Sequence, residues 1–536
     1  MRRLAVPALA AAVLFAALAL PNHPHTVTLP VFMRFPLELP VLLGCMLAIG
    51  YHDGARRILP ALAAAVLLIA LCVKLADIAM FTAYNRTFNP LLDVFLIGAG
   101  TTLLRDSIGT PGVIAAWTGA LLGMIGLFLA LWWALRLWAR VSVNNAARIM
   151  AVATAVIFAV LTVVDTGDRL KWWDLPQDVP GTSFTTRLVT KRALDVAATA
   201  ADLTEFRAQA ADDPYGDARG FFDLIAERDV MIIYIESYGR TSIDNPLYAP
   251  THLPTLRTAQ SAIADAGLAI ASGWLGSPTA GGQSWLAHGA ISSGLWTTDQ
   301  GRYSAMLTST RRTLFHLATE AGFRTAAVMP AITIAWPESS LMGFETILES
   351  DDMAYDGTAF GWVTMPDQYT LAAFPDLIGA DARRDFIQVA LISSHAPWTP
   401  VPQMVAWDLA TDGAIYHQMA TAGPTPREVW KNHDTVRDFY RRSIDYALRA
   451  ATGFAARQGQ EAPLILILGD HPPAGFVSQI EGTDVPAHLI GPADLLARIE
   501  DWGWTPGMIP QADVPSIRMD AFRDHFIAAF SSQEAR

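Results

Sequence analysis

The chain has 536 residues, of which 52% are hydrophobic and 16% are charged, and its mean hydropathy is +0.30. This composition is too apolar for an ordinary soluble protein, and the length is too great for one domain, so we expect at least two regions. The net charge of −12 is unevenly placed: residues 1–165 carry eleven Lys and Arg residues against six Asp and Glu, which leaves −17 on the remainder. An acidic soluble part argues against nucleic acid as a partner.

Five apolar runs, each near the length that a bilayer core requires, occupy the first 165 residues. They are 4–20, 37–51, 58–81, 112–135 and 147–165. A shorter run, 89–104, contains Asp93 and better suits a re-entrant or interfacial segment. The first run resembles a signal peptide, but further apolar runs follow it, which favours a membrane span. The sequence therefore predicts an N-terminal α-helical transmembrane domain of about five spans over 1–165.

The basic residues of the short loops predict the orientation, because Lys and Arg favour the cytoplasmic side. The charges that should share that side are Arg2, Arg3, Arg56, Arg57, Arg136, Arg140 and Arg148. They do so only if 89–104 does not cross. Five spans then place 166–536 outside, as in a multi-pass protein of a bacterial inner membrane with a periplasmic or extracellular catalytic domain.

Charged residues are rare inside the predicted spans. Lys74 and Asp77 lie three residues apart in the third run, on one helix face. We interpret them as a mutually satisfied pair or a snorkelling lysine rather than as a lipid or substrate path. Both cysteines, Cys45 and Cys72, also lie in apolar runs, so the soluble part cannot contain a disulfide.

The soluble part divides into a connector and a sheet domain. We expect a juxtamembrane helical connector over 166–220, with Trp172 and Trp173 at the membrane interface and a helix over 186–210. From 221 to 536, short runs rich in β-branched residues alternate with helical stretches. These runs are 229–235, 267–271, 324–328, 385–392, 463–468 and 485–490. The pattern predicts an α/β domain with a mostly parallel sheet that is buried on both faces.

Polar residues follow three of these predicted strands directly. Glu236, His395 and the pair Asp470-His471 stand at the ends of separate runs. Parallel strands present their carboxyl ends at one edge of a sheet, where ligands bind, so we expect these side chains to meet. Any one of them alone would be interpreted as a loop residue or a helix cap. Together, the carboxylates and the imidazole suit one divalent cation.

A hydroxyl group completes the predicted site. Ser284 follows Gly281 and Gly282 and should begin a helix, where free N–H groups favour an anionic phosphate. Next to a divalent cation, its hydroxyl would be a competent nucleophile at neutral pH. The alternative is an ordinary N-terminal capping serine, in which case Thr279 or a water would be the nucleophile.

Four motifs carry a family resemblance. They are Ile235-Glu236-Ser237, Gly282-Gln283-Ser284, Ser393-Ser394-His395-Ala396-Pro397-Trp398 and Leu468-Gly469-Asp470-His471-Pro472-Pro473. Their order resembles the alkaline phosphatase superfamily, and most closely the sulfatase-like branch that contains lipoteichoic acid synthases and phosphoglycerol transferases. The resemblance implies five membrane spans, a helical connector and an external catalytic domain. It also implies that Glu236, Ser284, Asp470 and His471 hold a manganese-like ion, that Ser284 replaces the usual threonine nucleophile, and that His395 contacts the substrate phosphate or the leaving group.

The substrate pocket departs from that family. Phosphoglycerol-using members have an Asp five residues before a pocket tryptophan and an Arg two residues after it, whereas Trp336 is flanked by Ala331 and Glu338 at those places. Trp336 is still expected to line the pocket. Arg302 or Arg324 would then supply the missing positive charge. Asp367 is a further pocket candidate, although a role in a loop turn suits it better.

These expectations favour a transferase. Ser284 would take a phospho-headgroup from a membrane phospholipid and pass it to a glycan or lipid acceptor, with one divalent metal ion, Mn before Mg or Zn. A phosphodiesterase or sulfatase-type hydrolase is the alternative, and a non-catalytic glycan-binding membrane protein is a third. A formylglycine sulfatase is disfavoured because Ser284 lacks the expected Pro and Arg after it. A phosphoethanolamine transferase is weakened by the lack of external cysteines. His488 lies within an apolar run and is expected to be buried rather than to bind a second metal.

Overall fold

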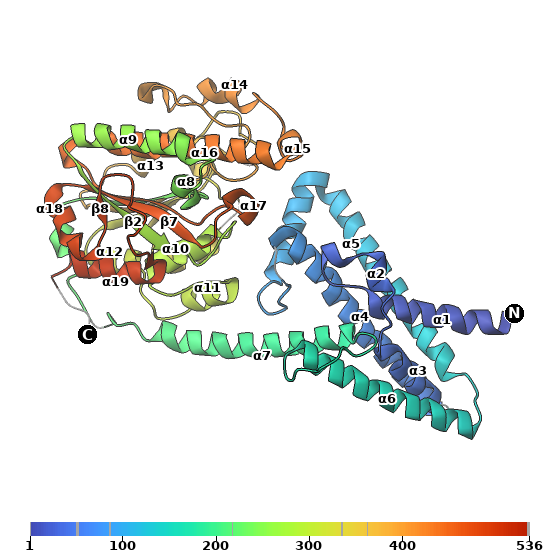
Figure 1. Cartoon of the computed structure of the whole chain (residues 1–536). Helices are drawn as coiled ribbons and strands as arrows, with labels where there is room; N and C mark the ends of the chain where they lie inside the picture. Colours follow the sequence, from blue (N-terminus) through green and yellow to red (C-terminus); the bar gives the residue numbers. More distant parts are fainter. Residues whose placement is uncertain are drawn as a thin grey trace. The chain divides into compact units, whose positions relative to one another are not determined.

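The computed structural model describes residues 2–49, 53–84, 87–216, 218–333, 336–361 and 363–532. The chain forms two compact units that divide between Asp202 and Leu203, within helix α7 (Phe184–Ala211). Figure 1 traces both units along the chain. Helix α7 contains the helix that we expected over 186–210. The predicted limits of the connector, 166–220, and of the catalytic domain, 221–536, stay predictions.

All five predicted apolar runs are helical in the first unit. Its helices are α1 (Arg2–Ala19), α2 (Leu29–Phe32), α3 (Glu38–Ala48), α4 (Asp53–Tyr84), α5 (Phe95–Ala139) and α6 (Asn145–Arg169). Among the residues that the structure describes, three segments are long and apolar enough to cross a membrane: Asp53–Thr82, Ile108–Ala139 and Asn145–Arg169. Ala5–Ala19 and Glu38–Ala48 are apolar but shorter than the roughly 20 residues of a typical span. Residues 50 and 51 of the second predicted run lie outside the described residues.

The short run 89–104 enters helix α5 but does not belong to its long apolar segment. Gly109 interrupts α5 with a φ of 73° and a ψ of 166°, outside the helical region. The residues before Gly109 therefore form a separate helical piece, which leads to Pro111 and the apolar segment beyond. A break at this point agrees with the expected separation of 89–104 from the spans, and its place relative to a membrane stays a prediction.

Lys74 and Asp77 are both fully buried, and each takes partners other than its neighbour. The Lys74 Nζ donates to the carbonyl oxygens of residues 17 and 18 and to the Thr185 hydroxyl at 2.8 Å. The Asp77 carboxylate accepts from the Arg192 guanidinium and from the Asn22 amide. The expected mutual pair and the snorkelling lysine are therefore both wrong. Helix α7 supplies Thr185 and Arg192, and the sequence spacing of the two charges could not reveal these distant partners.

The second unit is built on one nine-stranded sheet. Its strands are β1 (Val230–Ile235), β2 (Ala269–Gly276), β3 (Arg324–Val328), β4 (Thr346–Leu348), β5 (Asp385–Leu391), β6 (Leu464–Gly469), β7 (Asp484–Gly491), β8 (Thr505–Pro506) and β9 (Ile517–Arg518). The order is β4-β3-β5-β1-β6-β7-β2-β8, and β9 pairs with β2.

All six predicted strands are present, and the mostly parallel sheet is confirmed. Strands β4, β3, β5, β1 and β6 run parallel to one another. Strand β7 is antiparallel to both β6 and β2, so this side of the sheet is mixed. Apolar runs have the same appearance in either direction, and their sequence therefore could not give this reversal.

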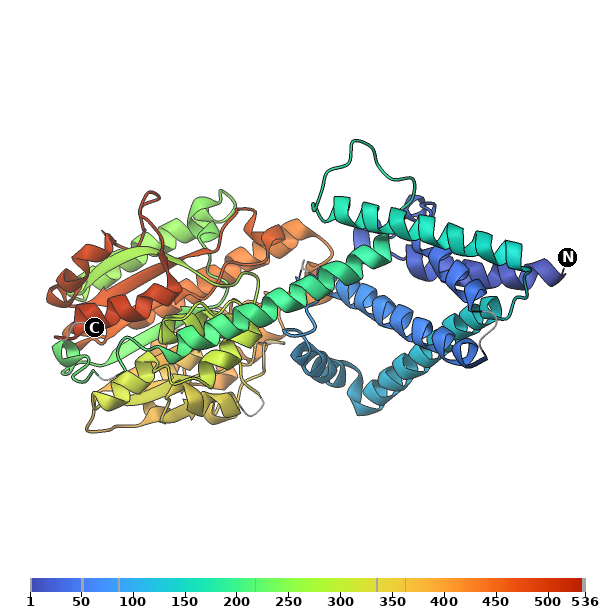
Figure 2. The same cartoon turned by 90° about the horizontal axis from the view of Figure 1, so that it is seen from below.

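Helices cover both faces of the sheet, as Figures 1 and 2 show. The longer ones are α9 (Ala249–Asp265), α10 (Ser284–Ser293), α11 (Gln300–Leu307), α12 (Leu314–Glu320), α13 (Asp367–Ile378), α16 (His433–Ala456) and α19 (Met519–Phe530). One-turn helices are α8 (Thr241–Asp244), α14 (His417–Ala420), α15 (Pro426–Val429), α17 (Gly475–Ser478) and α18 (Ala493–Leu496).

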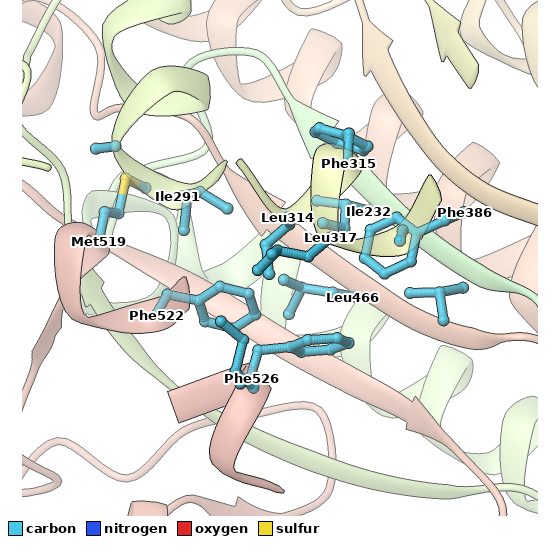
Figure 3. Packing of buried hydrophobic residues seen from close by; sticks show 14 of the residues in the cluster. Ile232, Ile291, Leu314, Phe315, Leu317, Phe386, Leu466, Met519, Phe522 and Phe526 are labelled. Atoms are coloured by element: carbon cyan, nitrogen blue, oxygen red, sulfur yellow. The ribbon is translucent and has the colours of Figure 1, made fainter. Parts of the chain in front are cut away.

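Two hydrophobic cores result, because successive side chains of a strand point to opposite faces. Ile232 of β1 and Leu466 of β6 pack with α10, α12 and α19 on one face, where Figure 3 shows Phe315 and Phe526 against them. Ile233 and the other alternate residues pack with α9, α13 and α16 on the other face. Burying each large apolar side chain contributes about 1.5–3 kcal/mol, so both cores hold the strand ends at fixed positions.

Candidate active site

The carboxyl ends of three neighbouring strands meet at one edge of the sheet. Ile235, the last residue of β1, pairs in register with Leu391 of β5 and with Gly469 of β6. The residues that follow these positions include Glu236, His395 and Asp470. The predicted convergence therefore follows from strand order and register together.

Glu236, Asp470 and His471 form a compact buried cluster. One ligand atom from each lies within 4.8 Å of the other two. The His471 Nε2 is 3.2 Å from a Glu236 carboxylate oxygen and 3.8 Å from an Asp470 oxygen. The other ring nitrogen, Nδ1, donates to the Pro472 carbonyl at 2.9 Å, which directs Nε2 toward the carboxylates. This is the arrangement in which an imidazole coordinates a cation.

The backbone around Asp470 fixes the orientation of its carboxylate. The N–H groups of Ser237 and His471 both donate to Asp470 Oδ1, at 2.8 and 2.6 Å. Ser237 adopts a left-handed φ of 59°, which is rare for a residue with a side chain and occurs at sites that the surrounding structure holds firmly. Oδ1 accepts both amides, and Oδ2 is the carboxylate oxygen that faces the His471 Nε2 atom.

Gly469 allows the chain to pass close to Tyr238 at the end of β6. A Cβ at position 469 would lie 1.9 Å from the Tyr238 carbonyl oxygen, closer than any atoms can approach without displacement. Glycine is therefore required directly before Asp470 for a steric reason. The sequence motif contained this residue, but only the tertiary structure shows what it accommodates.

Ser284 is the first residue of α10, as expected, and its hydroxyl reaches the cluster. Its Oγ donates to Glu236 Oε2 at 2.8 Å and lies 3.3 Å from His471 Nε2. The preceding Gln283 has a left-handed φ of 66°, which turns the chain into the helix. The Gly281 amide donates to the Pro472 carbonyl, so the serine loop is tied to the Asp470-His471 loop. Thr279, the alternative nucleophile, instead donates its hydroxyl to the Gly282 carbonyl at 2.8 Å.

The electrostatics of the cluster favour bound positive charge. Burial would raise the pKa of Glu236, but His471 and His395 outweigh it and hold that pKa well below its ordinary value. Burial and the charge of Glu236 raise the pKa of Asp470 well above its ordinary value. Burial would lower the pKa of His471, yet the two carboxylates raise it to about 9. Asp470 and His471 therefore hold protons more strongly than the isolated groups do, and together with the Glu236 carboxylate they form a donor set that also fits a divalent cation.

His395 stands at the rim of the cluster on the loop after β5. The Ser394 hydroxyl, next to it, donates to the Glu236 carbonyl at 2.6 Å, which ties this loop to the end of β1. His395 Nδ1 donates a hydrogen bond to the Ala396 carbonyl. His395 is half-buried and acts electrostatically on Glu236, so it lies near the cluster without belonging to the three-residue set.

Asp367 supports the same loop from behind. It is fully buried at the start of α13, and its Oδ1 accepts the Ile392 and Ser393 amides, each at 2.8 Å. Its own amide donates to the Ser393 hydroxyl. Burial raises the pKa of this carboxyl to about 6. Asp367 therefore holds the backbone that carries His395. The expected loop-turn role is wrong, because Asp367 is the buried first residue of α13 and its bonds reach the distant loop after β5.

The predicted substrate residues are less clearly assembled. Trp336 lies on the loop that leaves the carboxyl end of β3 and packs against Phe344, with ring centroids 6.1 Å apart. The Arg302 guanidinium lies over the Phe206 ring and donates to the Trp296 carbonyl, so its contacts here are with the protein itself. Their substrate roles stay predictions.

Arg324 cannot supply the missing positive charge. It begins β3, at the edge of the sheet opposite the cluster, and its guanidinium binds the Asp385 carboxylate at 2.6 and 2.8 Å. That alternative was therefore wrong. A residue at the start of a parallel strand lies at the opposite edge of the sheet from a residue that follows the strand. The sequence could have shown this, because Arg324 is the first residue of its predicted strand.

His288 is a buried histidine that the sequence reasoning missed. It lies one turn after Ser284 on α10, and its ring is 4.0 Å from that of Tyr234. Burial lowers the pKa of His288 to about 4, so the imidazole is neutral beside Glu236 and His471. The Ser-x-x-x-His spacing was the signal. His488, by contrast, is buried as expected, and its Nδ1 lies 2.8 Å from the Ser272 hydroxyl.

No family model matches the chain, and no curated protein gives a significant match. Among solved structures, it is similar to the integral membrane protein lipooligosaccharide phosphoethanolamine transferase A from Neisseria meningitidis, at 12% identity over 97% of this chain and 95% of that one, with a TM-score of 0.49. It is also similar to the lipoteichoic acid synthase LtaP from Listeria monocytogenes, at 10% identity, 62% and 79% coverage and a TM-score of 0.37.

A third similar structure is the phosphoglycerol transferase GacH from Streptococcus pyogenes in complex with sn-glycerol-1-phosphate. It is 14% identical, the match covers 62% of this chain and 82% of that one, and the TM-score is 0.37. A protein of the alkaline phosphatase superfamily from Vibrio parahaemolyticus also matches.

Proposed function

We propose that this protein is a membrane-anchored transferase that moves a phospho-headgroup from a membrane phospholipid to a glycan or lipid acceptor. The observation that carries the proposal is the Ser284 hydroxyl, which is hydrogen-bonded to Glu236 at 2.8 Å inside a buried carboxylate and imidazole cluster. The helical first unit would anchor the chain, with 166–536 on the external side of a bacterial inner membrane, as the loop charges predict.

Glu236, Asp470, His471 and Ser284 would hold one divalent cation, for which manganese is our first choice over magnesium and zinc. The cation would supply positive charge to the serine oxygen and to the phosphoryl oxygens. The described donor set of two carboxylates, one imidazole and one hydroxyl suits all three metals.

The chain's own residues provide nucleophile, proton transfer and orientation. Ser284 Oγ, which its hydrogen bond to Glu236 Oε2 orients, releases its proton to water and attacks phosphorus. The bond between phosphorus and the diacylglycerol oxygen breaks, and protonated His395 donates a proton to that oxygen. The acceptor hydroxyl then attacks the phosphoserine, its proton passes to His395, and the Ser284 oxygen takes a proton back from water. A water in place of the acceptor would give hydrolysis, and the product distinguishes the two reactions.

The direct test incubates the purified full chain with a headgroup-labelled phosphatidylglycerol, Mn²⁺ and a glycolipid acceptor. We expect diacylglycerol release, label on the acceptor, and a labelled peptide containing Ser284. Ser284→Ala should abolish all three and keep the thermal midpoint. Ser261→Ala is the matched control, because Ser261 is exposed on α9 and donates its hydroxyl to the Arg257 carbonyl of the same helix. Undiminished turnover in Ser284→Ala would refute the proposed nucleophile.

Metal content provides a second, independent measurement. His471→Ala removes an imidazole nitrogen from the cluster, and we expect metal affinity to fall about 10-fold or more, together with activity. Elemental analysis of the purified wild type and variant measures this. Equal metal content in both proteins would remove His471 from the predicted ligand set.

A further inference from the structure

An exposed tryptophan lies beside the catalytic loops and has no part in the chemistry described above. Trp430, at the end of α15, exposes 46% of its surface. Large aromatic side chains that stay this open at the rim of a site commonly mark a binding surface. The arrangement around Trp430 indicates what this surface would bind.

Trp430 is held rigidly against the loop that carries His395. Its ring stacks on the buried Trp398 ring, with centroids 5.8 Å apart and planes within 4°. Its Nε1 donates to the Pro397 carbonyl at 3.3 Å. Trp398 in turn donates its Nε1 to the Ser394 carbonyl at 2.7 Å. The parallel stacking fixes the orientation of the Trp430 ring, while 46% of its surface stays exposed.

The loop that follows His471 supplies a second wall. Phe476 lies edge-on to Trp430, with centroids 6.0 Å apart, and the His433 ring is 4.9 Å from Phe476. The Arg437 guanidinium donates two hydrogen bonds to the Phe476 carbonyl, which fixes this corner. Trp430 directly follows α15, and Phe476 lies in α17; Figure 1 labels both helices. The surface formed by Trp430 and Phe476 therefore adjoins both the loop that carries His395 and the loop that follows Asp470 and His471.

Polar groups of mixed charge surround the aromatic rings. Lys431, Asn432, His433 and Asp434 follow Trp430 directly, and all four are exposed. A flat aromatic face with donors and acceptors around it complements a pyranose ring, whose C–H groups project from its faces and whose hydroxyls project from its edge. A surface for anionic lipid would need an excess of basic residues, whereas 166–536 carries a net charge of −17.

We propose that Trp430 and Phe476 form the acceptor subsite of this enzyme and stack against a sugar ring of the acceptor. The inference rests on the proposed transferase function and specifies its acceptor as a carbohydrate, either a free glycan or the headgroup of a glycolipid. Stacking at Trp430 brings the sugar hydroxyls to the loop on which His395 takes the acceptor proton.

The test measures sugar binding without any chemistry. The full chain in a detergent without a sugar headgroup, carrying Ser284→Ala, is examined by saturation-transfer NMR with maltose, cellobiose and gentiobiose, and with diglucosyl diacylglycerol in mixed micelles. We expect saturation of the sugar ring protons to survive in Trp430→Phe, which keeps a stacking ring. In Trp430→Ala, binding should weaken about tenfold, the equivalent of about 1.4 kcal/mol. An effect on the disaccharides and the glycolipid alike identifies a site for any sugar ring, and an effect on the glycolipid alone identifies a lipid-linked acceptor.

Leu409→Ala serves as the control, because Leu409 is also exposed, at 48%. It should leave sugar binding unchanged. Equal saturation in the Ser284→Ala protein with and without Trp430→Ala would overturn the proposal. Steady-state kinetics with Ser284 intact provide a second check. If Trp430→Ala raises the KM for phosphatidylglycerol and leaves the acceptor KM unchanged, the surface contacts the lipid donor and the proposal is overturned. If Trp430→Ala loses sugar binding but the protein with intact Ser284 transfers no headgroup, the sugar site is supported and the proposed transferase function is refuted.

Discussion

Replacing the buried Asp367 by asparagine is expected to change how the stability of the protein depends on pH. Burial raises the pKa of this carboxyl from 3.8 to about 6 in the folded protein, and its hydrogen bonds to Ser393 and Ile392 only partly oppose the rise. Between these two pH values the folded chain keeps a proton that the unfolded chain releases. The resulting stabilisation is present below pH 3.8 and is lost as the pH rises through about 6.

The magnitude follows from the size of that shift. Each pKa unit corresponds to about 1.4 kcal/mol, so the rise to about 6 removes about 3 kcal/mol of stability between pH 4 and pH 7. The amide that replaces the carboxyl does not titrate. Whatever constant free energy this amide adds or removes, the stability of the variant relative to wild type should therefore rise by about 3 kcal/mol across this range.

Thermal unfolding of the full chain in detergent, followed at pH 4, 5, 6 and 7, measures the difference between wild type and Asp367→Asn. A change of about 3 kcal/mol corresponds to several degrees in the midpoint. Asp376→Asn is the matched control, because Asp376 is exposed on the same helix. A difference between Asp367→Asn and wild type that stays constant from pH 4 to pH 7 would show that the carboxyl does not titrate there, and the reasoning would fail.

Two further outcomes are expected. His395→Ala should lower turnover about 10²- to 10⁴-fold, the usual contribution of a general acid and base, while elemental analysis finds the metal retained; loss of the ion would make His395 a ligand instead. Gly469→Ala should destabilise the protein by at least about 1–3 kcal/mol and impair metal binding, because its Cβ would meet the Tyr238 carbonyl at 1.9 Å. Gly475→Ala, whose Cβ meets no atom within 4 Å, should leave the unfolding midpoint and metal content unchanged, and equal behaviour of the two variants would contradict the steric argument.

Much of the site could be predicted because its residues follow strands. The runs that end at Ile235 and Leu468 are unbroken and apolar, which identifies buried strands, and Glu236 and Asp470 come directly or almost directly after them. Parallel strands bring such residues to one edge whatever their order in the sheet. The sequence by itself therefore determined the carboxylates, the imidazole and the edge at which they meet.

Only the tertiary structure decided which atoms face one another. The Ser284 hydroxyl reaches Glu236 across 48 positions of sequence, and Lys74 finds Thr185 across 111. The reversal of β7 and the stacking of Trp430 on Trp398 likewise depend on contacts between distant segments. Local patterns report which side chains will be buried, because burial follows from hydrophobicity. Partners are selected when whole elements pack, and packing brings together residues that no spacing in the chain relates.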